Sequence, residues 1–441
     1  MEKTKTKKVR SEVVRDSINT FGTNAIGSVL SMLASFLTMR RVLPGSKAYY
    51  LMVQTWGSGF NTILGLSIGA AITYYVARYT IDNTKRAIRK LTLLLSVVIF
   101  VVAAVTLVFL RNTSLFRTTE TSFLVAIVVY GVASLLFSVC TTVLRGENKF
   151  KWYNMINLTQ QILMMLLAVF IFFHPKEMLL WSWATIGITV TMICLAFWGI
   201  LRWSGPKPVP VLSEDNRPVR AGEMVNYSLR SHVSNVMTYV NTYLGTYLVQ
   251  GRYTTTAYGI YTFAFTMMQQ VWILPDAVSQ VIMSRIPSMK EQKDKVRLTV
   301  LSAKIVIYVT AITAALLLVV AQTLIPVLFP KYAASVAPLG YLLIGAIFIS
   351  YAKVLNNSIS AYGHPEFNII PTTVGIISTV GFCLLFAPWG LNGIAIATSL
   401  SLTVQGLVSL GIFCRFSHTK PYRIFIPSKE EIASLREVFH K

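Results

Sequence analysis

Twelve stretches of mostly apolar residues, each about as long as a helix that crosses a bilayer, constrain this 441-residue chain more than any other feature. A helix needs about 20 such residues to span the hydrocarbon core. The chain is 54% hydrophobic and only 13% charged, whereas soluble domains are roughly 25% charged. We therefore expect an all-α integral membrane protein. The predicted spans are 17–39, 48–77, 92–110, 122–144, 154–173, 178–201, 228–250, 256–284, 298–325, 337–361, 368–387 and 392–414.

The basic residues are distributed unevenly around these spans. With a cytoplasmic N-terminus and twelve crossings, 29 of the 40 Lys and Arg residues fall in cytoplasmic segments, 8 in outer loops and 3 within spans. Positive charge favours the cytoplasmic side of a membrane, so both termini are expected there. The net charge of +23 then reflects orientation and attraction to anionic lipid. Nucleic-acid binding is not expected.

Two sequence patterns that would indicate a signal peptide and disulfides in a secreted protein are interpreted differently here. Basic residues precede the first apolar run as in a signal peptide, but that run exceeds the usual roughly 7 to 15 residues, so it is interpreted as a retained span. The four cysteines lie within or at the ends of spans without CxxC spacing, and neither disulfides nor a metal site is expected. They are Cys140, Cys194, Cys383 and Cys414.

A polar, proline-containing stretch from Arg202 to Glu223 has the composition of a linker and divides the spans six and six. In the C-terminal tail, Ser428 and Glu431 have capping-box spacing, which predicts a short helix on the cytoplasmic surface. The predicted organisation is a basic cytoplasmic N-terminus at 1–16, a six-helix bundle at 17–201, a cytoplasmic linker at 202–227, a second six-helix bundle at 228–414 and a cytoplasmic tail at 415–441.

The two halves share an ordered set of motifs. The sequence "RGENKF" after span 4 and "YGHPEF" after span 10 are related by a shift of 217 residues. This order predicts an internal duplication. Because each half has an even number of spans, the two bundles should be related by a pseudo-twofold axis along the membrane normal. Polar stripes in spans 1 and 7 are related by a shift of 211 residues: Asn24, Ser28, Ser31 and Ser35 in the first, and Asn235, Tyr239, Thr242 and Thr246 in the second.

Each stripe has two interpretations. Small polar residues commonly hold membrane helices together, and any one of these residues fits that role. A polar face repeated in both halves favours a shared, water-filled cleft between them. We assign Asn24, Asn235 and Tyr239 to this predicted substrate-binding cleft.

Lysine 353 interrupts the apolar run "GAIFISYAKVLNNSIS", where a mid-bilayer lysine costs about 2.5 to 3.5 kcal/mol. Lys353 lies about 12 Å from the inner end of its span at 1.5 Å per residue, which favours a cavity-facing side chain over one that snorkels. Arg230 and Lys304 lie nearer to inner ends, where both arrangements stay open. Arg40 and Arg41 follow span 1 at its outer end. This surplus of cations predicts a positive interior that attracts an anionic amphiphile carrying phosphate or pyrophosphate.

Asp276 is the only carboxylate within a predicted span. It either pairs with a cation such as Lys353 or Arg230, or it couples transport to H+ or Na+. Pro275 before it loosens the helix locally, which suits both roles. No organic cofactor is expected.

A membrane-bound glycosyltransferase or polymerase of sugar lipids is the alternative from the enzyme class. Enzymatic chemistry needs placed acids, bases or metal ligands. The predicted outer loops supply only Glu120 and Glu177 as acids, with His174 nearby, and the sequence has no nucleophile elbow or metal-ligand cluster. These features favour a transporter that is not an enzyme.

Four motifs resemble one family in their order along residues 10 to 415. They are "RRVLPGSKAYY" after span 1, "LRGENKF" after span 4, "SAYGHPEF" after span 10 and "APWGLNGIAIATS" entering span 12. They are similar to the polysaccharide transporters, or Wzx-type flippases, of the multidrug/oligosaccharidyl-lipid/polysaccharide (MOP) exporter superfamily. Related peptidoglycan-precursor flippases usually have fourteen spans and arginines within the first, whereas span 1 here has none between Ser17 and Met39.

The resemblance implies two six-helix bundles that work by alternating access. It implies movement of undecaprenyl-pyrophosphate-linked oligosaccharide from the inner to the outer leaflet of the bacterial cytoplasmic membrane, for synthesis of O-antigen, capsule or exopolysaccharide. It also implies a cationic central cavity, to which we assign Lys353, Arg40, Arg41 and Arg230. A monomer with contacts to polysaccharide assembly proteins is expected. Multidrug or small-molecule antiporters of the superfamily and peptidoglycan-precursor flippases stay as alternatives.

Overall fold

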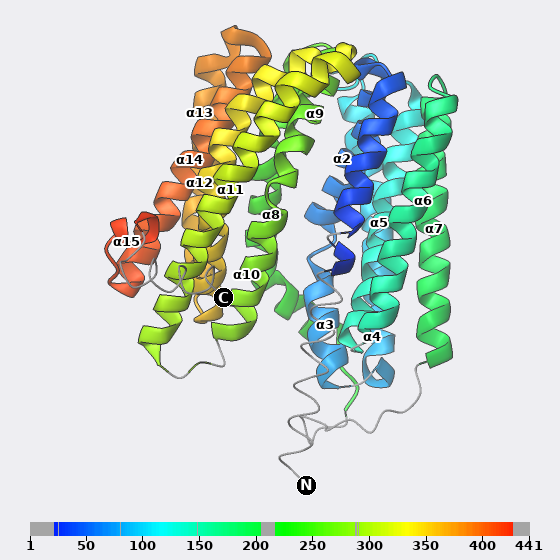
Figure 1. The fold of residues 1–441 in the computed structure, drawn as a ribbon. Coiled ribbons are helices and arrows are strands. Elements are labelled where there is room, and N and C mark those ends of the chain that lie inside the picture. Colours follow the sequence, from blue (N-terminus) through cyan, green and yellow to red (C-terminus); the bar gives the residue numbers. More distant parts are fainter. Residues whose placement is uncertain are drawn as a thin grey trace, which may run out of the picture. The chain divides into compact units, whose positions relative to one another are not determined.

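The structure, a computed structural model, describes residues 22–24, 26–79, 81–147, 149–203, 217–286, 289 and 291–426. Within these ranges every regular element is a helix (Figure 1). The predicted N-terminal segment 1–16, residues 204–216 of the predicted linker, and the tail helix with Ser428 and Glu431 lie outside the described residues.

The helices follow one another along the chain with short connections. They are Gly22–Arg41, α2 (Pro44–Leu64), α3 (Ile68–Arg78), α4 (Ile81–Leu110), α5 (Thr121–Gly146), α6 (Phe150–Phe173), α7 (Met178–Trp203), α8 (Ala221–Arg252), α9 (Thr255–Gln270), α10 (Ile273–Arg285), α11 (Gln292–Leu328), η2 (Pro330–Ser335), α12 (Val336–Ala361), η3 (Pro365–Asn368), α13 (Ile369–Phe386), η4 (Ala387–Trp389), α14 (Gly390–Ser417) and α15 (Tyr422–Phe425).

All twelve predicted spans coincide with helix in the described part of the chain. Eight helical segments there are long and apolar enough to cross a membrane, or nine if one bent pair counts as a single span. One of these segments, Glu366–Ser417, contains both α13 and α14. Helix α8 is not among them, since polar residues lower its hydropathy. The chain is therefore a multi-pass membrane protein, and twelve crossings stay a prediction.

The second predicted span is broken. Helices α2 and α3 meet at a bend of 60° across residues 65–67. Leu66 and Ser67 adopt left-handed conformations with φ of 50° and 49°, which cost an L-residue roughly 1–2 kcal/mol each. A side chain at Gly65 would collide with the carbonyl oxygen of Asn61, so glycine is required where α2 ends.

The eighth predicted span is broken as well, between α9 and α10 at Val271 and Trp272. Pro275 lies in the first turn of α10. Its ring lacks an N–H and clashes with the carbonyl four residues earlier, which is that of Val271. Proline is tolerated in a first turn because those N–H groups have no partner within the helix. The break therefore follows from the sequence, and it leaves Asp276 in the first turn of a new helix.

The chain divides into two compact units, Met1–Tyr239 and Val240–Lys441, at a point inside α8. In the first unit, α5 is central and contacts α2, α3, α4, α6 and α7. In the second unit, α12 is central and contacts α9, α10, α11 and α14, while α13 packs on α14 as α6 packs on α7. The helices of both units thus pack in the same order, as a duplication predicts.

A contact between an acidic and a basic side chain follows the central helix of each unit. After α5, Lys149 Nζ lies 2.7 Å from Glu147 Oε2. After α12, His364 Nδ1 lies 3.0 Å from Glu366 Oε1. Position 147 corresponds to 364, and 149 to 366, by the shift of 217 residues. The acidic residue comes first in the first unit and second in the second unit, so the contact recurs with the two residue types exchanged.

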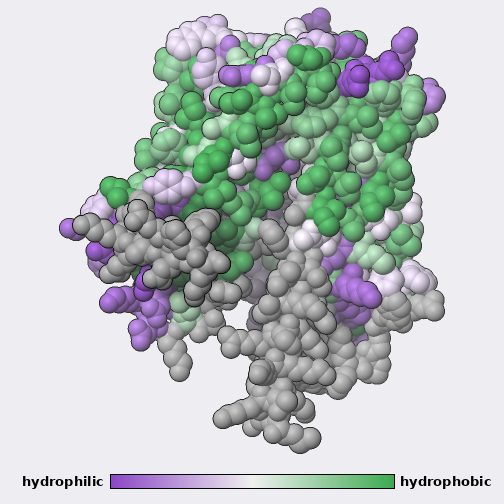
Figure 2. Space-filling model, in the orientation of Figure 1, coloured by the Kyte–Doolittle hydropathy of each residue, from purple (hydrophilic) through white to green (hydrophobic). Residues whose placement is uncertain are grey.

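Helix α4 has the two-sided surface expected of a helix between protein and lipid. One stripe is buried against the first unit and the opposite stripe is exposed although it is apolar. The buried stripe is Leu91, Leu95, Ile99, Ala103 and Leu107; the exposed stripe is Leu94, Val97, Val101, Val105 and Val108. Exposed apolar surface of this length is unfavourable in water. In the face drawn in Figure 2, hydrophobic residues cover the middle of the helices and hydrophilic residues gather near their ends.

Candidate functional site

The second unit brings Lys353, Asp276 and Trp272 together. Lys353 projects from the central helix α12, and its Nζ lies 2.7 Å from Asp276 Oδ1 at the start of α10. The same ammonium lies 4.2 Å from the centroid of the Trp272 ring at the helix break. The side chains of Lys353 and Asp276 are 26% and 52% exposed. The break between α9 and α10 thus supplies both the carboxylate and the aromatic face that hold the lysine.

This arrangement leaves the lysine able to bind an anion. An ammonium group has three hydrogen-bond donors, and the contacts to Asp276 and Trp272 do not use all of them. The quadrupole of an indole ring stabilises a cation over its face. Trp272 therefore helps to hold the Lys353 ammonium in place without adding a negative charge that would neutralise it. Among the described residues, Asp276 supplies the one carboxylate in an ion pair with Lys353, and an anionic group that reaches the lysine competes with it.

The first unit uses its helix break differently. Ser67 Oγ, at the bend between α2 and α3, accepts a hydrogen bond from Asn235 Nδ2 at 3.0 Å and lies 3.2 Å from His232 Nδ1. One turn further along α8, the Tyr239 hydroxyl donates to the carbonyl oxygen of Thr55 at 2.8 Å. Asn235 and Tyr239 therefore hold α8 against α2 and the bend, which is the helix-contact interpretation of these residues.

Three other predicted site residues belong to one helix of the first unit. Asn24 is exposed in the first turn of the helix Gly22–Arg41, and Arg40 and Arg41 are exposed at its other end. The Arg41 guanidinium carbon lies 4.9 Å from the centroid of the Phe172 ring. Arg230 belongs to α8, but its side chain lies outside the described part of the structure.

Lys47 lies between predicted spans 1 and 2, but the structure places it within a helix rather than in a loop. Helix α2 begins at Pro44, and Lys47 is only 6% exposed in its first turn. Its Nζ lies 3.2 Å from Ser35 Oγ, 3.1 Å from Thr38 Oγ1 and 3.5 Å from the carbonyl oxygen of Ser35. The spacing of Pro44, Lys47 and Ala48 on one buried helix face was a signal that could have identified it.

Neutral polar side chains pair inside the second unit. Asn241 Nδ2 of α8 donates to Gln405 Oε1 of α14 at 2.7 Å, and both residues are buried. Thr379 of α13 donates to Ser401 of α14 at 2.6 Å. Such hydrogen bonds hold membrane helices together, so this network is best described as structural.

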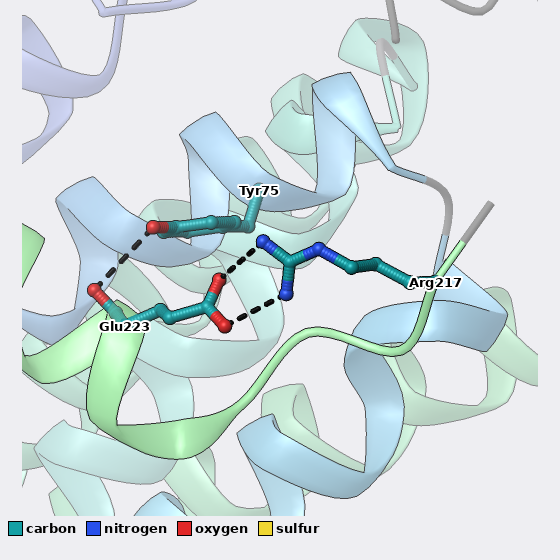
Figure 3. A network of polar contacts seen from close by, with 3 residues as sticks. All are labelled: Tyr75, Arg217 and Glu223. Atoms are coloured by element: carbon teal, nitrogen blue, oxygen red, sulfur yellow. Dashed lines mark hydrogen bonds and ion pairs between the residues drawn. The ribbon is translucent and has the colours of Figure 1, made fainter. Parts of the chain in front are cut away.

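A charged network anchors the beginning of α8 (Figure 3). Arg217 donates two hydrogen bonds to the carboxylate of Glu223, at 2.8 and 3.2 Å. The Tyr75 hydroxyl of α3 donates to the carbonyl oxygen of Glu223 at 3.4 Å. Glu223 precedes predicted span 7, and the hydrogen bonds from Arg217 lower the pKa of its carboxyl. Beside them, Tyr74 stacks on Tyr227 with ring centroids 4.6 Å apart.

Solved structures with the same arrangement of helices are membrane transporters. An inward-facing multidrug resistance MATE family transporter of the MOP superfamily has a TM-score of 0.69 and 17% identity, covering 89% of this chain and 94% of its own. The lipid II flippase MurJ, in an inward closed conformation, has a TM-score of 0.69 and 15% identity over 90% of this chain and 87% of its own.

A third similar structure is a MOP superfamily transporter from Pyrococcus furiosus, described as having a binding pocket of reverse polarity. Its TM-score is 0.65 and its identity is 14%, over 92% of this chain and 95% of that one. At these identities the likeness concerns the fold. Comparison with curated protein sequences finds no match.

The sequence itself identifies a family. The profile of a family described as "Polysaccharide biosynthesis protein" matches residues 79–337, which is more than half of the 441 residues. This match, together with the fold, bears out the resemblance noted in the sequence. The chain belongs to the polysaccharide biosynthesis protein family and has the fold of the MOP superfamily of membrane transporters and flippases.

Proposed function

We propose that the protein is a flippase for a lipid-linked oligosaccharide that carries phosphate or pyrophosphate. In this proposal the substrate is undecaprenyl-pyrophosphate-linked oligosaccharide, and it moves from the inner to the outer leaflet of a bacterial cytoplasmic membrane by alternating access. The observation that carries the proposal is Lys353, a lysine in an apolar helix held over Trp272 with one carboxylate beside it. The family match to polysaccharide biosynthesis supports a sugar-containing substrate.

The charge of the membrane-embedded residues supports an anionic substrate. The predicted spans contain Lys353, Lys304 and Arg230 but only one carboxylate, that of Asp276. Unlike charges attract strongly where the dielectric constant is low. A phosphate group pairs well with such cations, whereas a cationic drug is repelled by them. The multidrug alternative, which the MATE relatives raise, is therefore less favoured.

Asp276 is the proposed coupling group, with H+ or Na+ as the driving ion. Its carboxylate is shared with Lys353, so binding of an anion to the lysine releases the carboxylate. A released carboxylate takes up a proton or a sodium ion more readily than a paired one. Substrate and ion binding are coupled in this way without any direct contact between them.

The remaining parts of the proposal follow from the resemblance and the charge distribution. Both termini are cytoplasmic, the protein acts as a transporter rather than an enzyme, and it works as a monomer beside polysaccharide assembly proteins. A peptidoglycan-precursor flippase stays as the second candidate, since MurJ is among the similar folds.

A transport assay tests the proposal. Purified protein is reconstituted in liposomes that contain a fluorescent undecaprenyl-pyrophosphate-linked sugar in both leaflets, and quenching from outside measures transfer. The wild-type protein should accelerate transfer, and Lys353→Ala should lower the rate about tenfold or more, as expected when a charged hydrogen bond is lost. Lys85→Ala, which removes an exposed lysine of α4, is the matched control. Wild-type transfer no faster than in empty liposomes would contradict the proposal.

A further inference from the structure

Lys47 is a buried lysine to which the proposed function gives no role. It is 6% exposed, and its three hydrogen-bond partners are all oxygens of the helix Gly22–Arg41. Two of these oxygens belong to the hydroxyls of Ser35 and Thr38, and the third is the carbonyl oxygen of Ser35. Ser35 is also the last member of the polar stripe of span 1.

The oxygens around Lys47 are neutral. Among the residues that the structure describes, no carboxylate forms an ion pair with it. Lys353, by contrast, has Asp276 beside it. Burial of an ammonium group without an opposite charge is costly, and a buried ionisable residue in a membrane protein commonly marks a functional site.

A purely structural role accounts for only part of this arrangement. Cations near a helix C-terminus are favourable, which accounts for the contact of Lys47 with Thr38 in the last turn, but Lys47 also contacts Ser35, six residues before the end of the helix at Arg41. It also lies in the first turn of α2, where the helix dipole opposes a positive charge and favours an anion. The Lys47 ammonium, the Ser35 hydroxyl and this favourable field together match what an oxyanion requires. The Thr38 hydroxyl accepts a hydrogen bond from Lys47 and donates to the carbonyl oxygen of Ser35 at 2.9 Å.

We infer that Lys47, Ser35 and Thr38 form a binding site for the phosphate or pyrophosphate group of a lipid. The inference rests on the proposed function and extends it to a second cation, in the first unit. The flexible four-carbon stem of lysine lets the ammonium exchange its neutral partners for phosphate oxygens. Ser35 is only partly buried and Arg40 is exposed, so an anion meets positive charge before it reaches Lys47. In the predicted topology this site lies near the outer leaflet, where the lipid is released.

Binding measurements on the full-length protein in detergent test the inference. The probes are undecaprenyl pyrophosphate, undecaprenol, which lacks the anion, and inorganic pyrophosphate, which lacks the lipid. Lys47→Gln should weaken binding of undecaprenyl pyrophosphate about tenfold or more, as expected for lost charged hydrogen bonds. Lys47→Arg keeps the charge and should retain most of the binding. Lys176→Gln, at an exposed outer lysine, is the control and should bind as the wild type does.

The outcome is decisive even if Lys47→Gln does not fold. The double variant Ser35→Ala with Thr38→Val keeps the lysine and removes both hydroxyls, and it should weaken binding of undecaprenyl pyrophosphate while leaving undecaprenol unaffected. Unchanged binding in Lys47→Gln, or in the double variant where the former is unfolded, would overturn the inference. Inorganic pyrophosphate that binds as tightly as the lipid would overturn the assignment to a lipid headgroup.

The two proposals fail in different ways. If the wild-type protein transfers the sugar lipid but Lys47→Gln binds undecaprenyl pyrophosphate normally, only the role of Lys47 is wrong. If undecaprenyl pyrophosphate binds in a Lys47-dependent manner but the wild-type protein transfers no sugar lipid, the site stands and the flippase proposal fails.

Discussion

The Lys353 ammonium and the Asp276 carboxylate lie 2.7 Å apart across helices α12 and α10, although 77 positions separate them in the sequence. Their side chains are 26% and 52% exposed, so the pair leaves part of each charged group open to other ions. Its main consequence is electrostatic, since the carboxylate competes with any anion for the lysine.

Removal of the Asp276 charge should therefore strengthen anion binding. In Asp276→Asn the ammonium of Lys353 loses its fixed opposite charge, and undecaprenyl pyrophosphate should bind several-fold more tightly, by about 1 kcal/mol. Isothermal titration or fluorescence in detergent measures the change. Asp82→Asn, which breaks the exposed pair with Lys85 in α4, should leave affinity unchanged. Equal affinities in Asp276→Asn and wild type would show that the carboxylate does not compete.

Trp272 should matter for the position of the lysine more than for the fold. Replacement by Phe keeps an aromatic face under the Lys353 ammonium, which lies 4.2 Å from the ring centroid, whereas Ala removes it. Cation–π contacts contribute about 0.5 to 2 kcal/mol, so Trp272→Ala should reduce transport several-fold and Trp272→Phe should reduce it less. Rates in proteoliposomes provide the measurement. A larger loss with Phe than with Ala would contradict the stacking role.

The hydrogen bond between Asn241 and Gln405 should affect stability and leave substrate affinity unchanged. Asn241→Ala leaves the buried Gln405 amide without its partner, at a cost of about 1 kcal/mol. The thermal unfolding midpoint in detergent should fall, and the double variant with Gln405→Ala should fall by less than the sum of the single changes. Additive changes would indicate that the two amides act independently.

The contact that anchors the start of α8 should weaken at acidic pH. The Arg217 guanidinium lowers the pKa of Glu223 in the folded protein, below the value of about 4.3 for an unperturbed glutamate. The stability from this pair is fully present above the unfolded pKa and is lost as the pH falls through the folded pKa. Hydrogen exchange of residues 221–224 should therefore accelerate as the pH falls through the lowered pKa of Glu223, after correction for intrinsic rates. In Glu223→Gln this acceleration should disappear, and its persistence would assign the effect to another group.

The helical content and its order were predictable because hydrophobic runs of about 20 residues have few alternatives in a membrane. The two breaks were not predicted. At residues 65–67 the apolar pattern continues across the bend, and Leu66 and Ser67 are not residues that usually adopt a left-handed conformation. At 271–272 the sequence did contain a signal, Pro275. From it we expected only a local loosening of the helix and not a break.

The chemical types of the site residues were easier to predict from the sequence than their positions in the fold. The cost of an embedded charge singled out Lys353 and Asp276, and the structure brings them together. Asn235 and Tyr239 contact Ser67 and Thr55, because a polar stripe has the same spacing whether it faces water or another helix. The assignment of these residues to substrate binding stays a prediction.

The exchanged contacts between acidic and basic side chains after α5 and α12 bear on the predicted duplication of the chain. Glu147 and Lys149 in one copy correspond to His364 and Glu366 in the other. The same kind of contact is thus made at matched positions with either order of the acidic and the basic residue. A comparison of the two halves that looks only for identical residues would overlook it.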